Sequence, residues 1–158
     1  MNLKLMLEEV AERHGGKTAI VSGDYRLSYT GLDETSNRIA NALIKLGVNK
    51  GDRVAMLLSN SPEFVIIYFG IVKIGAIAVL LDPKYKVSEL VTLFNDCQPK
   101  VLVTEATALE PLAPMLPRFK YLRQVIDLGA EYKGQFLTYG EMAAAGSAQR
   151  IEVGPEPD

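Results

Sequence analysis

The side chains that could do chemistry in this chain are few and scattered. His14 is the only histidine of the 158 residues; it follows a short helical pattern and precedes two glycines, so we interpret it as a cation at a helix end. Cys97 is the only cysteine and lies in an apolar helical pattern, which favours an unreactive buried thiol. One histidine and one cysteine are a poor basis for a metal site. The sequence therefore predicts neither a metal centre nor an identifiable catalytic residue.

Phosphate chemistry is also weakly supported. The glycine-rich loops that cradle phosphates, Gly-x-Gly-x-x-Gly and Gly-x-x-x-x-Gly-Lys-Ser/Thr, do not occur. The helix that begins after Ser61 could accept an anion at its free amides, although a well-capped helix is the simpler interpretation. Lys84 and Lys86 could meet a phosphate, or they could simply be solvated. Asp52 and Asp82 flank strands and are typical of turn residues rather than of an acidic pocket.

The apolar stretch that would position these groups allows two interpretations. Residues 64–81 carry one charge, Lys73, and are long enough for a membrane span. The local signals favour a helix over 62–74 that Ser61 caps and Gly75 ends, followed by a strand over 76–81. Lys73 then lies in the last turn, where the helix dipole favours a cation. In a membrane span the same charge would cost about 2.5–3.5 kcal/mol.

The remaining elements follow from hydrophobic periodicity and turn residues. Helices are predicted over 3–13, 31–46, 62–74, 87–97, 108–116 and 139–145, the last capped by Thr138, and strands over 18–21, 26–29, 53–58, 76–81, 100–104 and 121–127. Thr30 is the predicted N-cap of the second helix, with Asp33 close to a capping box. Prolines 111 and 114 should make the helix over 108–116 short or bent.

The alternation of short apolar strands with helices predicts an α/β fold. We expect a mostly parallel sheet with helices on both faces, preceded by an N-terminal helix and a β-hairpin. The helix over 62–74 is apolar all round, so it must lie in the centre of the domain or be covered by something outside this chain. This second possibility makes the chain part of a larger domain.

Composition excludes several classes of function. The chain has 17 Lys and Arg residues against 19 Asp and Glu residues, a net charge of −2, which does not suggest a nucleic-acid or anionic-membrane partner. The first ten residues contain acids too early for a signal peptide. A single cysteine cannot form an internal disulfide, so a cytoplasmic location is the default.

Five stretches in order resemble the adenylate-forming enzymes, the superfamily of acyl-CoA synthetases, luciferases and peptide-synthetase adenylation domains. They cover residues 27–40, 46–55, 60–64, 73–83 and 95–104. Two positions depart from the family pattern: Leu80 stands where proline is usual, and Gly31 where glutamate is usual. Neither position is catalytic in the family.

The resemblance implies the N-terminal portion of a longer ATP-dependent acyl-CoA synthetase. Residues 1–150 would be an N-terminal α/β subdomain, and residues 151–158 would lead toward an ATP-binding loop, because the end from Gly154 to Asp158 resembles the approach to that loop. The longer enzyme would use ATP, Mg²⁺ and coenzyme A and would act on a carboxylic acid. Lys84 matches a position that lies near the nucleotide end of coenzyme A in some relatives. The chain alone is predicted to be inactive and to bind none of these ligands tightly.

Alternatives remain open at this point. The run from Leu81 to Tyr85 suits a peptide-synthetase adenylation domain about as well, and carrier-protein sequence beside it would identify that branch. A stand-alone flavodoxin-like binding module also fits the alternating pattern. A third possibility is an interaction domain that self-associates through the helix over 62–74.

Overall fold

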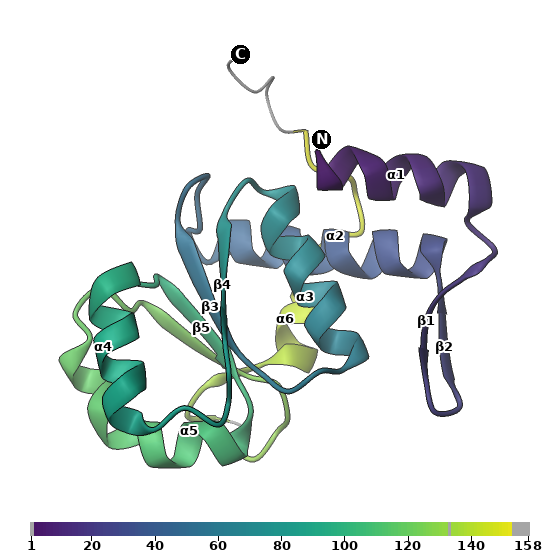
Figure 1. Ribbon diagram of the computed structural model, residues 1–158. Helices are drawn as coiled ribbons and strands as arrows, with labels where there is room; N and C mark the ends of the chain where they lie inside the picture. Colours follow the sequence, from purple (N-terminus) through teal and green to yellow (C-terminus); the bar gives the residue numbers. More distant parts are fainter. Residues whose placement is uncertain (1, 133, 153–158) are drawn as a thin grey trace.

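The centre of the molecule is a parallel sheet with the strand order β4-β3-β5-β6-β7 (Figure 1). The computed structural model describes residues 2–132 and 134–152. The strands are β3 Arg53–Leu57, β4 Ile77–Leu81, β5 Val101–Thr104, β6 Gln124–Asp127 and β7 Leu137–Thr138. All four pairings between neighbours are parallel. The sheet predicted from the sequence is confirmed; β7, with only two residues, was not predicted.

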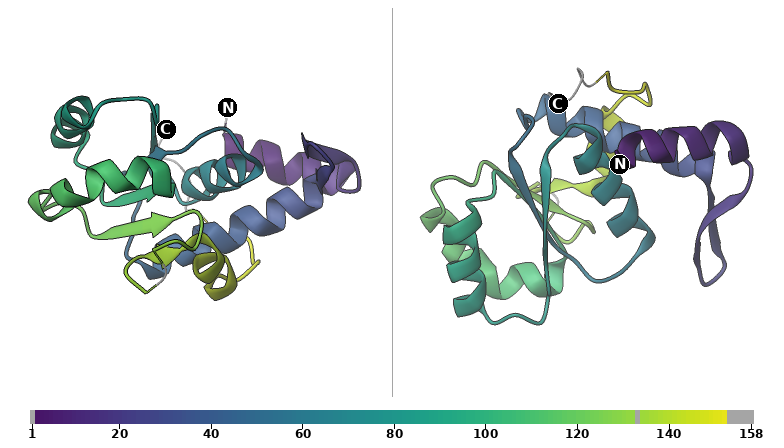
Figure 2. Two further views of the ribbon diagram at one scale, coloured as in Figure 1. Left: turned by 90° about the horizontal axis from the view of Figure 1, so that it is seen from below. Right: turned by 45° about the horizontal axis from the view of Figure 1, so that its top comes forward.

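Helices cover both faces of this sheet. On one side lie α1 Leu3–His14, α2 Tyr29–Lys45, α3 Pro62–Lys73 and α6 Tyr139–Ala145, and on the other lie α4 Val87–Cys97, α5 Ala106–Leu112 and the 3₁₀-helix η1 Ala113–Arg118 (Figures 1 and 2). Alternate residues of β3 separate the two cores: Met56 packs with the first group, and Leu57 with the second. The hairpin of β1 Thr18–Ser22 and β2 Tyr25–Ser28 joins α1 to α2 and projects from the N-terminal end of α2 (Figure 1).

Helix α2 begins earlier than predicted, and the prediction of Thr30 as its N-cap was wrong. The cap is Ser28, whose Oγ accepts a hydrogen bond from the Gly31 amide at 3.0 Å. Because the helix already starts at Tyr29, Asp33 does not serve a capping box and lies 5% exposed within the fold. The carboxylate that seemed to belong to a helix end is thus a buried group.

The apolar stretch forms a helix, a glycine turn and a strand. Ser61 Oγ accepts from the Phe64 amide at 3.2 Å, and Gly75 takes a positive φ of 71° after the last turn of α3. Within the described residues, no helix has the length and apolar character that crossing a bilayer requires. Helix α3 packs centrally against α2, where Gly70 lies against Ile39. Its outer side chains are only half-buried.

The proline-containing helix is short, one of the two outcomes that its sequence predicts. The α-helical part α5 ends at Leu112, and the chain tightens into η1 where Pro114 follows. Helix α4 begins at Val87, with Lys86 as the residue before it.

Candidate functional site

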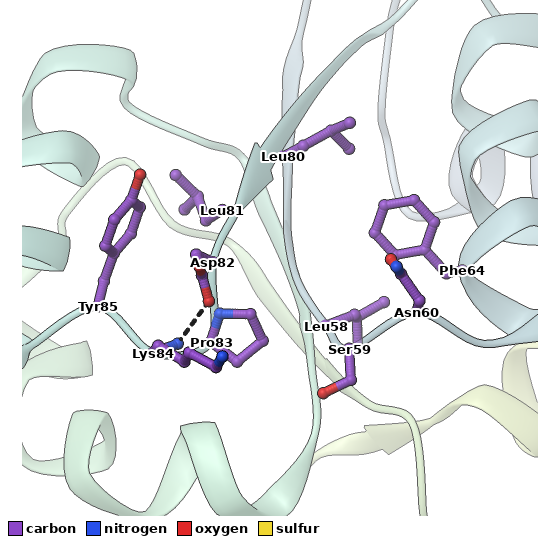
Figure 3. Close-up of a pocket in the computed structure, with 10 residues that line it drawn as sticks. All are labelled: Leu58, Ser59, Asn60, Phe64, Leu80, Leu81, Asp82, Pro83, Lys84 and Tyr85. Atoms are coloured by element: carbon purple, nitrogen blue, oxygen red, sulfur yellow. Dashed lines mark hydrogen bonds between the residues drawn. The ribbon is translucent and has the colours of Figure 1, made fainter.

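A surface depression of about 590 Å³ lies at the carboxyl ends of β3 and β4 (Figure 3). Ligands of open α/β sheets bind beyond the carboxyl ends of the strands, near the point where the strand order reverses. In this sheet the chain steps from β3 to β4 on one side and then to β5 on the other side of β3. The depression is therefore next to the reversal point, on its β4 side.

Two loops and the start of α3 build the depression. Lys84 and Tyr85 form one wall, and Asn60 and Phe64 face them from the other (Figure 3). Leu80, which is 52% exposed, adds an apolar surface between them. The pocket thus combines aliphatic and aromatic carbon with a small number of polar groups.

Lys84 is held by its backbone and leaves its side chain in solvent. Asp82 Oδ1 accepts from the Lys84 amide at 2.8 Å, and the Asp82 carbonyl accepts from the Tyr85 amide at 3.0 Å. Asp82 is therefore a turn residue, as predicted. The Lys84 side chain is exposed, and its ammonium group has no hydrogen bond or ion pair with the part of the chain that the structure describes. This arrangement allows the ammonium group to meet an anion in the depression.

The reversal point itself is closed by a contact that the sequence did not reveal. Glu105 follows β5, and its Oε1 accepts hydrogen bonds from the Ser59 amide at 3.2 Å and from Ser59 Oγ at 2.7 Å. The contact joins the ends of two strands that are 46 positions apart in sequence. Periodicity gave no signal for it, because the pairing of β3 with β5 had to be known first.

Acidic side chains occupy the other side of that contact. A second depression of about 390 Å³ is lined by Glu63, Glu105 and Glu131 together with Tyr139. Burial, and secondarily the charge of Glu63, raises the pKa of the Tyr139 phenol to about 12. Among the described residues no group of three or more His, Cys, Asp or Glu side chains is arranged to hold a metal ion.

The amides at the start of α3 are not a strong anion site. Ser61 already takes the Phe64 amide, and Glu63 places a negative charge in the first turn. The interpretation of this segment as a capped helix is therefore the better one. A polyphosphate placed at this helix start would meet the carboxylates of Glu63 and Glu105.

The other candidates lie away from this site or are structural. Asp52 precedes β3, at the opposite end of the strand, and accepts from the Asn49 amide at 2.8 Å and from Lys100 Nζ at 3.0 Å. Both contacts lower the pKa of the Asp52 carboxyl, the Asn49 amide most. Cys97 is only partly buried, so the prediction of a buried thiol is not met, although burial still raises the pKa of its thiol. His14 is exposed in the last turn of α1.

Lys86 lies just before α4, and its side chain is exposed. Its amide donates to Glu89 Oε2 at 2.7 Å, which orders the first turn of α4. Of the two lysines that follow Asp82, only Lys84 lines the larger depression.

A buried ion pair is the largest feature that sequence reasoning missed. Lys73 lies in the last turn of α3, as predicted, but its side chain is 0% exposed. Its Nζ donates to Asp33 Oδ1 at 2.5 Å and to Asn37 Oδ1 at 2.7 Å. Loss of hydration outweighs the attraction of Asp33 and lowers the pKa of the Lys73 ammonium. The i, i+4 spacing of Asp33 and Asn37 was the one available signal.

Comparisons with known proteins agree on a single group of enzymes. The family model of the AMP-binding enzyme matches residues 7–158. A crotonobetaine/carnitine–CoA ligase of Salmonella paratyphi A is 38% identical over 128 residues, which cover 78% of this chain and 23% of that protein. The chain thus spans about a quarter of the length of the curated relatives that it matches.

Solved structures give the same picture. The anthranilate–CoA ligase AuaEII in complex with anthranoyl-AMP superposes with a TM-score of 0.89 at 27% identity, covering 94% of this chain and 29% of that one. MbtA of Mycobacterium smegmatis gives 0.87 at 28% identity, covering 99% and 29%. The N-terminal domain of FACL13 from Mycobacterium tuberculosis gives 0.79 at 27% identity, covering 99% and 39%.

Proposed function

The chain belongs to the AMP-binding enzyme family, and from that premise we propose that it is the N-terminal α/β portion of an ATP-dependent acyl-CoA ligase. The observation that carries the proposal is the 38% identity to a CoA ligase over most of this chain. Family membership disfavours a stand-alone flavodoxin-like module. The CoA ligases among the relatives favour acyl transfer to coenzyme A over a peptide-synthetase role.

The proposed reaction has two halves. A carboxylate attacks the α-phosphate of ATP and forms an acyl-adenylate with release of pyrophosphate. The thiol of coenzyme A then attacks the acyl carbon, and AMP leaves. Both halves need cationic groups and backbone amides around the phosphates. The described residues offer the carboxylates of Glu63, Glu105 and Glu131 there instead, so we propose that this chain alone does not catalyse adenylation. We also propose that residues 1–150 form an N-terminal subdomain of the longer enzyme.

We assign Lys84 the role of contacting a phosphate at the nucleotide end of coenzyme A. Its exposed ammonium group beside the larger depression supports the assignment. An exposed charge pair contributes roughly 0.2–1 kcal/mol, which corresponds to an affinity change of about 1.4- to 5-fold. Lys84 would thus orient coenzyme A more than it would hold it. The cytoplasmic location stays a prediction.

Two measurements test these proposals. The 158-residue chain, incubated with ATP, Mg²⁺, radiolabelled pyrophosphate and carnitine or anthranilate, should show no exchange above a blank. Exchange above the blank would contradict the inactivity proposed for this chain.

The Lys84 assignment is tested separately by titrating coenzyme A into the labelled chain and following amide signals by NMR. Lys84→Gln should weaken the response by the factor given above, whereas Lys86→Gln, a matched change outside the depression, should not. Equal responses of the two variants would contradict the assignment.

A further inference from the structure

A stripe of polar side chains runs along one face of α2. Asp33, Asn37, Asn41 and Lys45 follow one another at intervals of four residues, so they share a face of the helix. The segment of residues 145–150, called the strap below, begins at the last residue of α6 and lies along this stripe (Figures 1 and 2). The stripe and the strap are about a hundred positions apart in sequence.

The stripe binds the strap by its main-chain carbonyls. Lys45 Nζ donates to the Ala145 carbonyl at 2.7 Å. Asn41 Nδ2 donates to the Ser147 and Gln149 carbonyls at 2.8 and 2.9 Å. These contacts depend on the backbone path of the strap and not on its side chains.

A glycine makes the close approach possible. A Cβ atom built on Gly146 would overlap the carbonyl oxygen of Arg38 on α2. Gly146 itself has φ −87° and ψ 142°, which any residue can adopt. The position therefore excludes other residues only because the strap touches the helix, and an alanine there would disturb the docking without straining the backbone.

Two ion pairs of Arg150 hold the far end of the strap. Arg150 Nη2 donates to Asp33 Oδ2 at 3.2 Å, and Nη1 pairs with Glu12 of α1. The same Asp33 carboxylate accepts from Lys73 through Oδ1. Asn37 is shared in the same way, because Oδ1 accepts from Lys73 while Nδ2 donates to the Ala148 carbonyl at 3.2 Å.

We propose that α2 holds the strap in a fixed path and that the shared residues Asp33 and Asn37 couple the strap to helix α3. Helix α3 ends at the buried Lys73 and begins at the wall of the larger depression. Arg150 and Asp33 are thus positioning residues that join the strap to the last turn of α3. The inference stands independently of the proposed ligase reaction.

The test uses Gly146→Ala with Gly16→Ala as the matched control, because an added Cβ at Gly16 meets nothing within 4 Å. In the labelled 158-residue chain, ¹⁵N relaxation should give order parameters of about 0.85 for residues 147–150, as for rigid backbone. In Gly146→Ala these values should fall below about 0.6, and the amide signals of the last turn of α3 should shift. The control should retain the original values.

A second variant provides the same test without a steric clash. Arg150→Gln removes the ion pairs with Glu12 and Asp33, so it should lower the order parameters of residues 149–152 and shift the amide signals of the last turn of α3. Strap order parameters that stay near 0.85 in both variants would overturn the docking. A loosened strap with unchanged α3 signals would overturn the coupling through Asp33 and Asn37. Neither measurement involves ATP or coenzyme A, so failure here is distinct from failure of the proposed function.

Discussion

The two partners of the buried ion pair should respond very differently to substitution. Asp33→Asn keeps the shape of the side chain but leaves the Lys73 ammonium group, which is 0% exposed, without its carboxylate. Removing one partner of a buried pair costs about 3–5 kcal/mol. Lys73→Met removes the buried charge instead, and Asp33 keeps Arg150 as a partner. We expect that change to cost less than about 1 kcal/mol or to stabilise the fold.

Urea unfolding of the 158-residue chain measures the contrast. With a slope of about 1–3 kcal/mol per molar urea, Asp33→Asn should lower the midpoint by about 2 M, and Lys73→Met should leave it nearly unchanged. Lys50→Met, at an exposed position, is the control for the loss of a lysine.

A pH series adds a second measurement. Because the pKa of Lys73 is lowered in the folded state, the unfolded chain binds more protons between that pKa and the ordinary value of 10.5. The stability of the wild type should rise with pH in this window relative to Lys73→Met. The reasoning is refuted if Lys73→Met costs as much as Asp33→Asn, or if the two chains keep a constant difference across the window.

Two further outcomes follow from the other pKa shifts. Burial raises the pKa of Tyr139 in the folded state to about 12, above its ordinary value of 10, so the stability that the neutral phenol contributes is intact below pH 10 and is lost as the pH rises toward 12. The urea midpoint of Tyr139→Phe should therefore fall less between pH 10 and pH 12 than that of the wild type. An identical fall of the two midpoints would contradict the raised pKa. Burial raises the pKa of the Cys97 thiol, so iodoacetamide should alkylate this cysteine more slowly at neutral pH than a cysteine in an unfolded peptide. Denaturing urea should abolish the difference in rate. Equal rates without urea would show that Cys97 is an accessible thiolate and would contradict the prediction.

Local signals sufficed for the elements but not for the contacts between them. The Ser61 cap and the Gly75 turn are decided within a few residues, and both were predictable. The start of α2 was misplaced because Ser28 and Thr30 are both good caps, and only the position of the preceding strand selects Ser28. Strand β7 has two residues, too few for periodicity to detect.

The buried polar groups could not be predicted for a different reason. Lys73 lies in the last turn of α3, where the helix dipole favours a cation, so the presence of a lysine there does not by itself indicate a partner such as Asp33. Only the packing of α3 against α2 brings the two together, 40 positions apart. The same holds for Glu105, which reaches Ser59 across the sheet. Long-range polar contacts leave no periodic pattern, because one residue on each side suffices.

The negative charge at the start of α3 and between the ends of β3 and β5 disfavours binding of nucleotide phosphates there. The amides at the start of α3 are served by Ser61, and the gap between β3 and β5 is filled by the Glu105 carboxylate. Glu63 and Glu131 add negative charge beside it. A polyphosphate placed here would lose hydration and meet repulsion from these carboxylates. We therefore expect the phosphate donors for adenylation to come from segments other than the described residues, whereas the exposed Lys84 beside the larger depression can meet one phosphate of coenzyme A.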